Sequence, residues 1–569
     1  MKSQSSNPTG RLGVLIVFLL ASIPLLAQTG TTYYVSTSGN DNNPGTIGAP
    51  WLTIQHAANS VSAGATVNVL TGIYSESVNF PASGTASDPI TFQSYPGQTA
   101  VIDGTQVGCC TSNPASSGNQ TQGLINIVNQ SYIVISGFEI RNYGTTKAVY
   151  TPAGVWITGS GTGVQLLNNL VHDITTSSEK NGNAFGISVY GTSKTPINSL
   201  VIHGNQVYNL KTGESESVNV DGNVTNFSIT NNLVHDNDNI AIAAIGYEGV
   251  GPVGYDESMY GEISGNTIYN ISGIHNAGEG HSYDADGVYC DGCAYVTVEQ
   301  NLIHNVDYGI EVASEHRKCL SNGTEWTAPN DTGNPGTGTH PCDGRYVTVR
   351  NNVVYDSNAC GISIGGYADD IKVGPDDRCC GGSSQVVIVN NTLYNNNTKN
   401  QAGEFQIQYH SGIAQGNFFE NNIVYAGKQN VWINSFVKAT AKYPAPPATL
   451  NWNLYYSEAG YVKGKSIVWG GMHNYKNYTD YQTATGEDAD SPNGNPLFVN
   501  VEGMPPDLDI TAASPAVNMG SISLPCSVGW CNGNSPDSIY GSTDFLGDPR
   551  LNGSTINIGA YESTGITKR

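Results

Sequence analysis

Basic residues are scarce in this chain of 569 residues, which has 23 Lys and Arg against 46 Asp and Glu and a net charge of −23. A surface with so few cations repels nucleic acids and anionic membranes, because both carry dense negative charge. It also disfavours polyanionic ligands unless divalent cations bridge them to the protein. We therefore expect no nucleic-acid partner.

Long apolar runs are absent after the first 27 residues, so we expect no membrane span. Lys2 and Arg11 precede the short run LGVLIVFLLASIPLLA at 12–27, which is typical of an export signal. Removal of 1–27 would leave 21 cations against 46 anions, a net charge of −25. The eleven Cys fit disulfides in an exported chain, although spacing does not fix their pairing. We expect a secreted monomer, either extracellular or periplasmic.

A fixed repeat length is also missing, although one phrase recurs: an apolar alternation, Asn, an apolar residue, then Tyr or His. Examples are ITNNLVH at 229–235, ISGNTIY at 263–269 and IVNNTLY at 388–394. The spacing of the second Asn varies from 27 to 51 residues, which disfavours a β-propeller and fixed-length helical repeats. These Asn residues are 169, 205, 232, 266, 301, 352, 391 and 422. Irregular spacing favours stacked coils joined by loops of variable length.

Alternating apolar residues predict which side of each strand faces inward, because successive side chains of a strand point to opposite faces. The expected inward pairs are Val155/Ile157, Ile187/Val189, Val218/Val220, Val288/Cys290, Ile310/Val312, Ile362/Ile364, Phe405/Ile407 and Val431/Ile433. The Asn of each phrase falls at a bend, where its side chain can cap backbone groups and stack on the next Asn. This pattern predicts an all-β parallel β-helix, in which each coil is buried only by its neighbours.

The two ends of the chain differ in sequence pattern from the repeat region between them. Residues 28–130 read as an N-terminal cap with one helix at about 51–62 and the first coils. Residues 131–436 carry the repeats, and 437–569 read as turn-rich C-terminal coils and a cap. Caps are expected because the last coil of a β-helix presents bare strand edges.

The opening YYVSTSGNDNNPGT…PWLTIQHAANSV…GATVNVLTGIYSESV resembles the N-terminal segment of secreted right-handed parallel β-helix proteins of the pectate-lyase-like group, related to family 9 polysaccharide lyases. The ending NPLFVN…SPAVNMGS…DFLGDPR…NIGAYES is similar to the tail of that group. The resemblance covers nearly the whole chain after the signal. It implies a polysaccharide partner and the right-handed fold, but the group includes lyases, glycoside hydrolases, epimerases and proteins of unknown role.

Outward positions of the same strands predict an extended groove of polar and aromatic side chains, suited to sugar rings and hydroxyl groups. We expect substrate contacts from Trp156, Tyr190, Asn219, Asp221, Tyr289, Gln406, Gln408 and His410, with Glu315 and His316 on the flank. Asp291 and Glu311 fall diagonally on adjacent coils, about 8 Å apart. Glycoside cleavage needs two carboxyl groups about 5–9.5 Å apart, so these two are candidate catalytic residues.

Acidic residues near this pair also suit a Ca²⁺ ion, which takes oxygen ligands. The family pattern of an Asp-rich calcium site with a nearby catalytic Lys is matched loosely by Asp284, Asp286, Asp307 and Lys372. The resemblance therefore implies Ca²⁺ as cofactor and Lys372 as base. The same Asp residues can equally be turn residues without a catalytic role.

Three functions follow from these patterns. The first is a polysaccharide lyase that uses Ca²⁺ to eliminate across a uronate polymer, which the resemblance favours. The second is a glycoside hydrolase that uses Asp291 and Glu311. The third is a non-catalytic surface or adhesion protein whose groove binds glycan.

Overall fold

The computed structural model describes residues 30–110, 120–177, 182–252, 254–278, 280–314, 320–321, 324–325, 343–366, 382–408, 416–435, 446–523, 536–551 and 553–562. The expected export signal at 1–27 lies outside this set. Within these ranges no helix is long and apolar enough to cross a bilayer.

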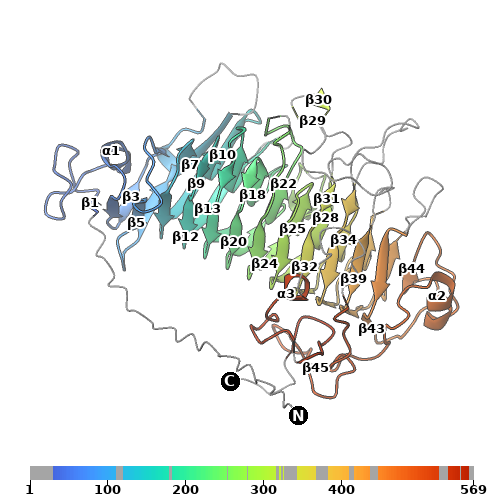
Figure 1. The fold of residues 1–569 in the computed structure, drawn as a ribbon. Helices are drawn as coiled ribbons and strands as arrows, with labels where there is room; N and C mark the ends of the chain where they lie inside the picture. The colour runs from blue at the N-terminus through green and yellow to red at the C-terminus, as the bar shows by residue number, and fades with distance from the viewer. Residues whose placement is uncertain are drawn as a thin grey trace, which may run out of the picture.

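Three long sheets of parallel strands run the length of the molecule (Figure 1). Sheet 1 contains β1 (Thr32–Val35), β2 (Thr66–Val69), β5 (Ile90–Ser94), β8 (Ile133–Ser136), β12 (Gln165–Leu167), β16 (Val201–His203), β20 (Ser228–Thr230), β23 (Glu262–Ser264), β26 (Thr297–Glu299), β32 (Thr348–Arg350), β36 (Val387–Val389), β39 (Asn417–Glu420) and β42 (Ala448–Asn451). Sheet 2 contains β4 (Val78–Asn79), β7 (Gln120–Val128), β10 (Tyr150–Thr158), β14 (Phe185–Gly191), β18 (Val218–Gly222), β22 (Ile242–Ile245), β25 (Asp286–Asp291), β28 (Tyr308–Ala313), β34 (Cys360–Ile364), β38 (Gly403–Ile407), β41 (Ile433–Ser435) and β44 (Ile467–Val468). Sheet 3 contains β3 (Gly72–Tyr74), β6 (Ala100–Asp103), β9 (Glu139–Thr145), β13 (Leu170–Thr176), β17 (Gln206–Tyr208), β21 (Leu233–Asn237), β24 (Thr267–Ile271), β27 (Leu302–Val306), β33 (Val353–Tyr355), β37 (Thr392–Tyr394), β40 (Ile423–Tyr425) and β43 (Leu454–Tyr456).

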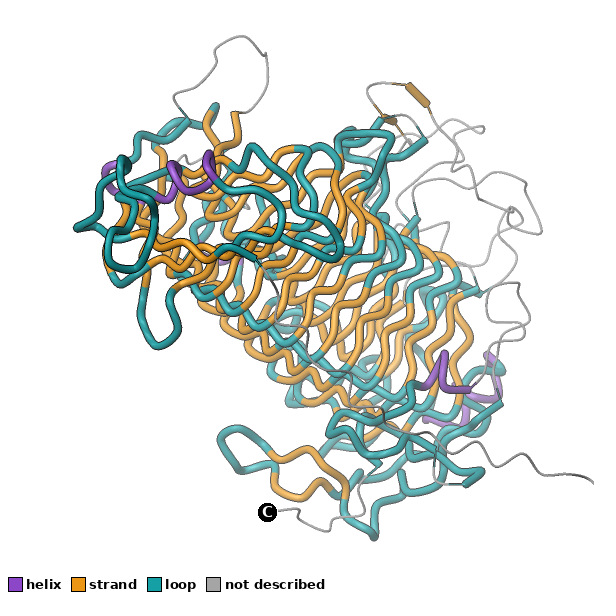
Figure 2. Tube along the Cα trace, turned by 60° about the vertical axis from the view of Figure 1, so that its left-hand side comes forward, coloured by secondary structure: helices purple, strands orange, loops and turns teal. Residues whose placement is uncertain are grey.

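Each coil of the repeat region supplies one strand to sheet 1, then one to sheet 3 and one to sheet 2. Figure 2 shows these coils stacked side by side along the molecule. The chain is a right-handed parallel β-helix, which confirms the predicted fold.

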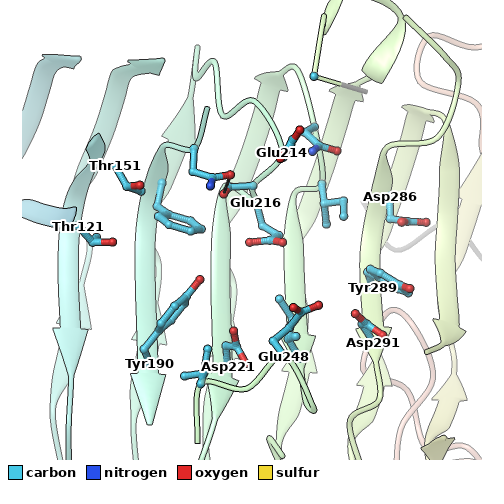
Figure 3. Close-up of a pocket in the computed structure, with 18 of the residues that line it drawn as sticks. Thr121, Thr151, Tyr190, Glu214, Glu216, Asp221, Glu248, Asp286, Tyr289 and Asp291 are labelled. Atoms are coloured by element: carbon cyan, nitrogen blue, oxygen red, sulfur yellow. Dashed lines mark hydrogen bonds between the residues drawn. The ribbon is translucent and has the colours of Figure 1, made fainter. Parts of the chain in front are cut away.

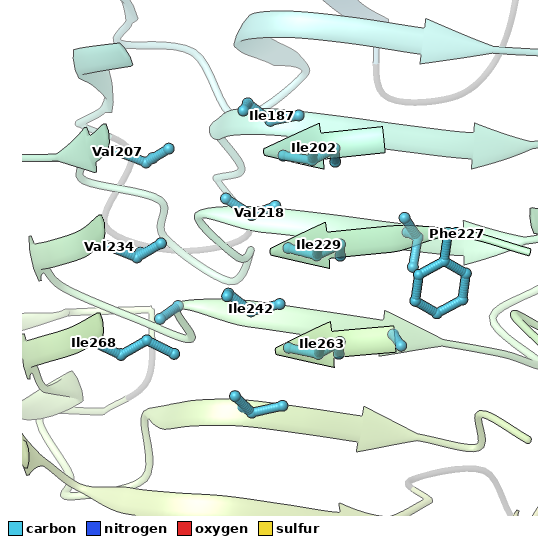
Figure 4. Packing of buried hydrophobic residues seen from close by; sticks show 14 of the residues in the cluster. Ile187, Ile202, Val207, Val218, Phe227, Ile229, Val234, Ile242, Ile263 and Ile268 are labelled. Atoms are coloured by element: carbon cyan, nitrogen blue, oxygen red, sulfur yellow. The ribbon is translucent and has the colours of Figure 1, made fainter. Parts of the chain in front are cut away.

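The interior is filled by equivalent apolar side chains that lie above one another in successive coils. Ile202, Ile229 and Ile263 stack from sheet 1, and Figure 4 shows the matching columns from the other two sheets. Seven of the eight predicted inward pairs are buried at both positions. In the eighth pair Ile433 is buried but Val431 is partly exposed, and Trp432 turns into the core instead.

The Asn residues form a buried hydrogen-bond ladder at the bend between sheets 1 and 3, as predicted. The Asn232 backbone N–H and its side-chain amide both donate to Asn266 Oδ1, at 2.9 and 3.0 Å. The same amide donates to the carbonyl of Ile202, 2.9 Å away in the preceding coil. Each Asn therefore satisfies backbone groups that the bend removes from the strand ladders. The ladder runs through Asn169, Asn205, Asn232, Asn266, Asn301, Asn352, Asn391, Asn422 and Asn453.

Helices cover the two open ends. α1 (Ile54–Ser60) lies within the predicted 51–62, and its N-cap Thr53 accepts a hydrogen bond from the backbone N–H of His56. At the other end α2 (Tyr478–Thr485) places the fully buried Tyr481 in the core cluster. These apolar contacts shield the first and last coils from solvent.

The rest of the C-terminal segment packs along the outside of the stack (Figure 1). Asn351, Asn390 and Asn421 donate side-chain hydrogen bonds to its backbone carbonyls, at 2.8–2.9 Å. The remaining elements are short: β11 (Gly161–Thr162), β15 (Ile197–Asn198), β19 (Val224–Thr225), β29 (Leu320–Ser321), β30 (Thr324–Glu325), β31 (Gly344–Arg345), β35 (Ser383–Ser384), β45 (Phe498–Asn500), β46 (Asp507–Ile510), α3 (Pro536–Tyr540), and the 3-10 turns η1 (Gly104–Gln106) and η2 (Gly273–His275).

Replacement of one ladder residue tests how much the amide ladder stabilises the fold. Asn266→Ala leaves buried donors and acceptors in both neighbouring coils without partners, at about 1–3 kcal/mol for each group. We expect the free energy of unfolding in urea to fall by about 3 kcal/mol or more. Asn270→Gly is the control, because Asn270 is exposed and its φ of 54° suits glycine. Equal losses in the two variants would contradict a special role for the ladder.

Candidate active site

A pocket of about 970 Å³ opens on the outer face of sheet 2 and crosses the strands from β7 to β25. Figure 3 shows several of its side chains projecting from neighbouring strands and from the segments that join them. The described lining residues are Thr121, Thr151, Trp156, Asn183, Phe185, Tyr190, Glu214, Ser215, Glu216, Asp221, Asn239, Ile240, Ile245, Glu248, Val250, Gly278, Asp284, Asp286, Tyr289 and Asp291. The groove expected from the sequence is therefore a pocket in the N-terminal half of the coil stack.

Strand register explains why residues far apart in the sequence meet here. Trp156, Ser188 and Asn219 occupy equivalent positions on β10, β14 and β18, and Tyr190 is the register partner of Asp221. These partnerships were predicted. The sequence missed the next coil, whose strand β22 presents Ala243 and Ile245 at the outward positions. Asp221 and Asp291 are therefore two coils apart, about 9.6 Å at the usual strand spacing.

Carboxylates dominate the pocket, and none of its described lining residues is Lys, Arg or His. Asp221 is 2% exposed, and its Oδ1 atom has no hydrogen-bond partner. Burial raises the pKa of Asp221 well above its usual range, and the negative charges of Glu248, Asp256 and Glu216 raise it further. The pocket therefore disfavours the charged form of Asp221, which is one of its seven carboxylic side chains. The seven are Glu214, Glu216, Asp221, Glu248, Asp284, Asp286 and Asp291.

Aromatic side chains form the other end of the pocket. The rings of Trp156 and Tyr190 lie 4.8 Å apart, and Phe185 meets Tyr190 edge-on at 6.0 Å. Burial, followed by the charge of Asp221, raises the pKa of the Tyr190 hydroxyl well above its usual value, so this hydroxyl stays neutral. The arrangement places an apolar surface beside hydrogen-bonding groups, as sugar-binding pockets require.

Three acidic residues of the pocket were not predicted. Glu214 and Glu216 lie in the segment before β18, and Glu248 lies in the loop after β22. The alternation GESES at 213–217, directly before SVNVDG, was a signal for the first two. Asn219 holds the second of them: it is fully buried, and its amide donates to Glu216 Oε2 at 3.0 Å. The predicted contact between Asn219 and substrate is therefore replaced by a supporting role.

The segment around Asp291 is held by a disulfide between Cys290 and Cys293, both fully buried. Asp291 is 4% exposed and lines the pocket together with Tyr289 and Asp286. Asp284 lies at the edge of the pocket, where burial raises the pKa of its carboxyl group. The structure therefore groups several predicted site residues, although Asp286 was expected to bind metal.

Glu311 does not form the predicted reaction centre with Asp291. The diagonal register is as expected, since Tyr289 pairs with Glu311 and Asp291 with Ala313. However, the Glu311 side chain is fully buried, and its carboxylate accepts a hydrogen bond from the amide of Gln408, two coils further on. Neither Glu311 nor Gln408 lines the pocket. Gln406, a predicted substrate contact, also lies beyond the pocket.

Asp307 is a structural residue of the bend between β27 and β28. Its Oδ1 accepts hydrogen bonds from Ser272 Oγ and Asn358 Nδ2, at 2.9 and 2.7 Å. Its Oδ2 accepts from the backbone N–H groups of Gly273 and Ala285, at 2.8 and 3.2 Å. Four protein donors thus occupy the carboxylate that was expected to bind Ca²⁺.

The calcium site that the sequence suggested stays a prediction, but Asp307 is not placed to contribute to it. Asp307 faces the backbone rather than the pocket, and no described group of three or more His, Cys, Asp or Glu side chains is placed to hold a metal ion. The remaining predicted site residues are outside the described part of the chain: Lys372, Glu315, His316 and His410.

Comparison with known proteins identifies the group. Residues 33–209 match the family model described as the Pel9A-like right-handed β-helix region. A segment of 112 residues is 35% identical to pectate lyase PEL9 of Emericella nidulans and covers 19% of this chain and 27% of that enzyme. The solved structure of pectate lyase Pel9A aligns over 94% of this chain and 96% of its own, with 14% identity and a TM-score of 0.39.

A longer match extends over most of the chain. It is 32% identical over 476 residues to YwoF, an uncharacterized protein of Bacillus subtilis, and covers 83% of this chain and 89% of YwoF. The chain therefore belongs to the same family as YwoF, and its residues 33–209 form a Pel9A-like right-handed β-helix region.

Proposed function

We propose that this protein is a carbohydrate-active enzyme that hydrolyses a polysaccharide bound in the acidic pocket, with Asp221 as general acid and Glu248 as the partner carboxylate. The observation that carries the proposal is the buried Asp221, whose pKa is raised well above its usual range within a pocket lined by other carboxylates. Carboxyl pairs whose environments separate their pKa values are the usual means of cleaving glycosidic bonds.

The roles follow from the two environments. Asp221 is almost fully buried and holds its proton, whereas Glu248 is exposed on its loop and lines the same pocket. In the reaction Asp221 would give its proton to the glycosidic oxygen as the bond from that oxygen to the anomeric carbon breaks. The Glu248 carboxylate would attack the anomeric carbon or take a proton from the attacking water. Trp156 and Tyr190 would stack against a neighbouring sugar ring.

A second candidate is the Ca²⁺-assisted elimination across a uronate polymer. It is favoured by the Pel9A-like family match and by the segment shared with pectate lyase PEL9. The family match ends at residue 209, before the first of the seven pocket carboxylates. The likeness to the lyases therefore supports the scaffold and the aromatic end of the pocket more than the acidic end. Calcium as a cofactor belongs to this second candidate alone.

Export from the cytoplasm is part of the proposal. It is supported by the signal-like segment 1–27 and by the Cys109–Cys110 and Cys290–Cys293 disulfides, which persist in oxidising compartments. A polysaccharide partner and a monomeric state are proposed with it.

Removal of the general acid should abolish turnover. Asp221→Asn should lower kcat by about 10²–10⁴-fold, the usual contribution of general acid catalysis. The measurement is release of reducing ends from a panel of neutral and acidic polysaccharides. The exposed Asp490→Asn should retain wild-type turnover. Unchanged kcat in Asp221→Asn would remove Asp221 from the mechanism.

Protein stability gives a second test of Asp221, independent of substrate. Because its pKa is raised in the folded state, the folded protein holds a proton that the unfolded chain releases above about pH 4. Wild-type stability therefore falls as pH rises from about 4 towards the folded pKa, by about 1.4 kcal/mol for each pH step of one within that range. Asp221→Asn should raise Tm at pH 7 and have little effect at pH 4. A Tm gain of equal size at both pH values would contradict the raised pKa.

Chelation separates the two candidate reactions. For the hydrolase, EDTA should leave the release of reducing ends unchanged, and the products should lack the ultraviolet absorbance of an unsaturated uronate. Appearance of that absorbance on a uronate polymer, with loss of activity in EDTA, would establish the lyase instead. Binding without turnover across the whole panel would indicate a glycan-binding protein.

A further inference from the structure

Glu248 reaches the pocket on a loop that leaves sheet 2 after β22 and returns at Ser258. Its neck is a short antiparallel bridge between Gly246 and Glu257. The backbone N–H of Tyr247 donates to the carbonyl of Asp256 at 2.8 Å, which closes the neck. The loop is thus a side excursion from the coil, and its residues Val250 and Gly251 lie close to Gly222 at the end of β18.

Two sets of hydrogen bonds hold the backbone on either side of Glu248. On one side the Asp256 carboxylate accepts the N–H groups of Gly249 and Gly251, at 2.7 and 2.6 Å. On the other side the Tyr247 hydroxyl accepts a hydrogen bond from Arg345 Nη1, at 2.7 Å. The first set lies within the loop, but the second comes from a residue almost one hundred positions further along the chain.

Arg345 lies on β31 and is only 5% exposed. Its guanidinium donates through both terminal nitrogens to the Glu257 carboxylate, so its charge is compensated inside the protein. Burial lowers the pKa of Arg345, but the charge of the Glu257 carboxylate and the hydrogen bonds to Glu257 and Tyr247 outweigh that effect and raise the pKa above its usual value. Buried ion pairs add little net stability, because desolvation offsets attraction, but breaking one is costly. The pair of Arg345 and Glu257 therefore holds the neck of the loop in one geometry and adds little to the stability of the fold.

The same arginine is tied to the segment that carries Asp291. The Arg345 backbone N–H donates to the carbonyl of Cys293 at 3.0 Å, next to the disulfide that encloses Asp291. The Tyr247 ring packs against Gly292, where an added Cβ would lie 2.8 Å from Tyr247 Cδ2. Arg345 and Tyr247 thus contact both the loop of Glu248 and the strand end of Asp291.

We propose that Arg345 and Tyr247 are positioning residues that hold Glu248 at a fixed distance from Asp221 and Asp291. The inference rests on the proposed function, because it identifies the residues that support Glu248, the partner carboxylate in that function. Neither side chain lines the pocket, so both act through Glu248 and not on substrate.

Tyr247→Phe is the sharpest test, because it keeps the ring against Gly292 and removes only the hydroxyl that binds Arg345. Loss of a hydrogen bond to a charged group changes an equilibrium constant by about tenfold or more. We therefore expect kcat to fall by about tenfold, with KM nearly unchanged. Tyr260→Phe is the matched control: Tyr260 is 47% exposed, follows the same loop and should keep wild-type kinetics.

The pH profile distinguishes positioning from a general loss of structure. Glu248 helps to raise the pKa of Asp221. A displaced Glu248 would lower that pKa, so the alkaline limb of the kcat profile should move to lower pH in Tyr247→Phe. Arg345→Lys, which keeps the charge but loses the planar fork, should produce the same shift without unfolding, as judged by Tm. Wild-type kcat and an unmoved limb in both variants would overturn the proposal.

Hydrogen exchange tests the inference separately from catalysis. The amides of Gly249 and Gly251 should exchange about tenfold faster in Tyr247→Phe than in wild type or Tyr260→Phe, because the loop opens more often. Wild-type protein that hydrolyses no polysaccharide would overturn the proposed function. Faster exchange in Tyr247→Phe would still support the positioning of the loop by Arg345 and Tyr247. Unchanged exchange together with unchanged kinetics in Tyr247→Phe would overturn the positioning role of Arg345 and Tyr247 and leave the hydrolase proposal standing.

Discussion

The ladder of buried Asn amides is the interaction on which the rest of this structure depends. Each amide satisfies a backbone carbonyl in the coil before it and an amide oxygen in the coil after it. The bend between sheets 1 and 3 can therefore be buried without losing hydrogen bonds. Because the ladder sets the register of each coil against the next, it also decides which outward side chains meet on sheet 2.

Register alone would give an even face of polar side chains, and the pocket arises where the coils depart from regularity. The coil of β22 has the small outward residue Ala243, and its following loop folds Glu248 back over the sheet. The coil before it adds Glu214 and Glu216 from the segment that leads into β18. Acidic side chains from two segments thus lie around Asp221, whose charged form becomes costly. The raised pKa of Asp221 is a consequence of packing, not of any local motif.

The family of this protein constrains its scaffold more than its chemistry. The Pel9A-like match ends at residue 209, and YwoF shares most of the chain without a described activity. Asp307 shows how a residue type can mislead when a family pattern is carried over. Its carboxylate is fully used by four donors of the protein, which is the turn role that Asp often has. Acidic residues near a bend need their hydrogen bonds counted before a ligand role is assigned.

The sequence by itself determined the parallel β-helix, the inward face of its strands, the Asn ladder and the helix near its start. These features follow from periodicity and bend residues, which are local properties of the chain. It also found Trp156, Tyr190, Asp221 and Asp291, because strand parity places them on one outward face. Only the tertiary structure showed that β22 separates Asp221 from Asp291, that Glu311 is buried and bonded to Gln408, and that Arg345 bonds Tyr247 in the loop of Glu248. Those outcomes depend on where loops of unequal length fold back across the coils, and no local pattern in a single sequence encodes that.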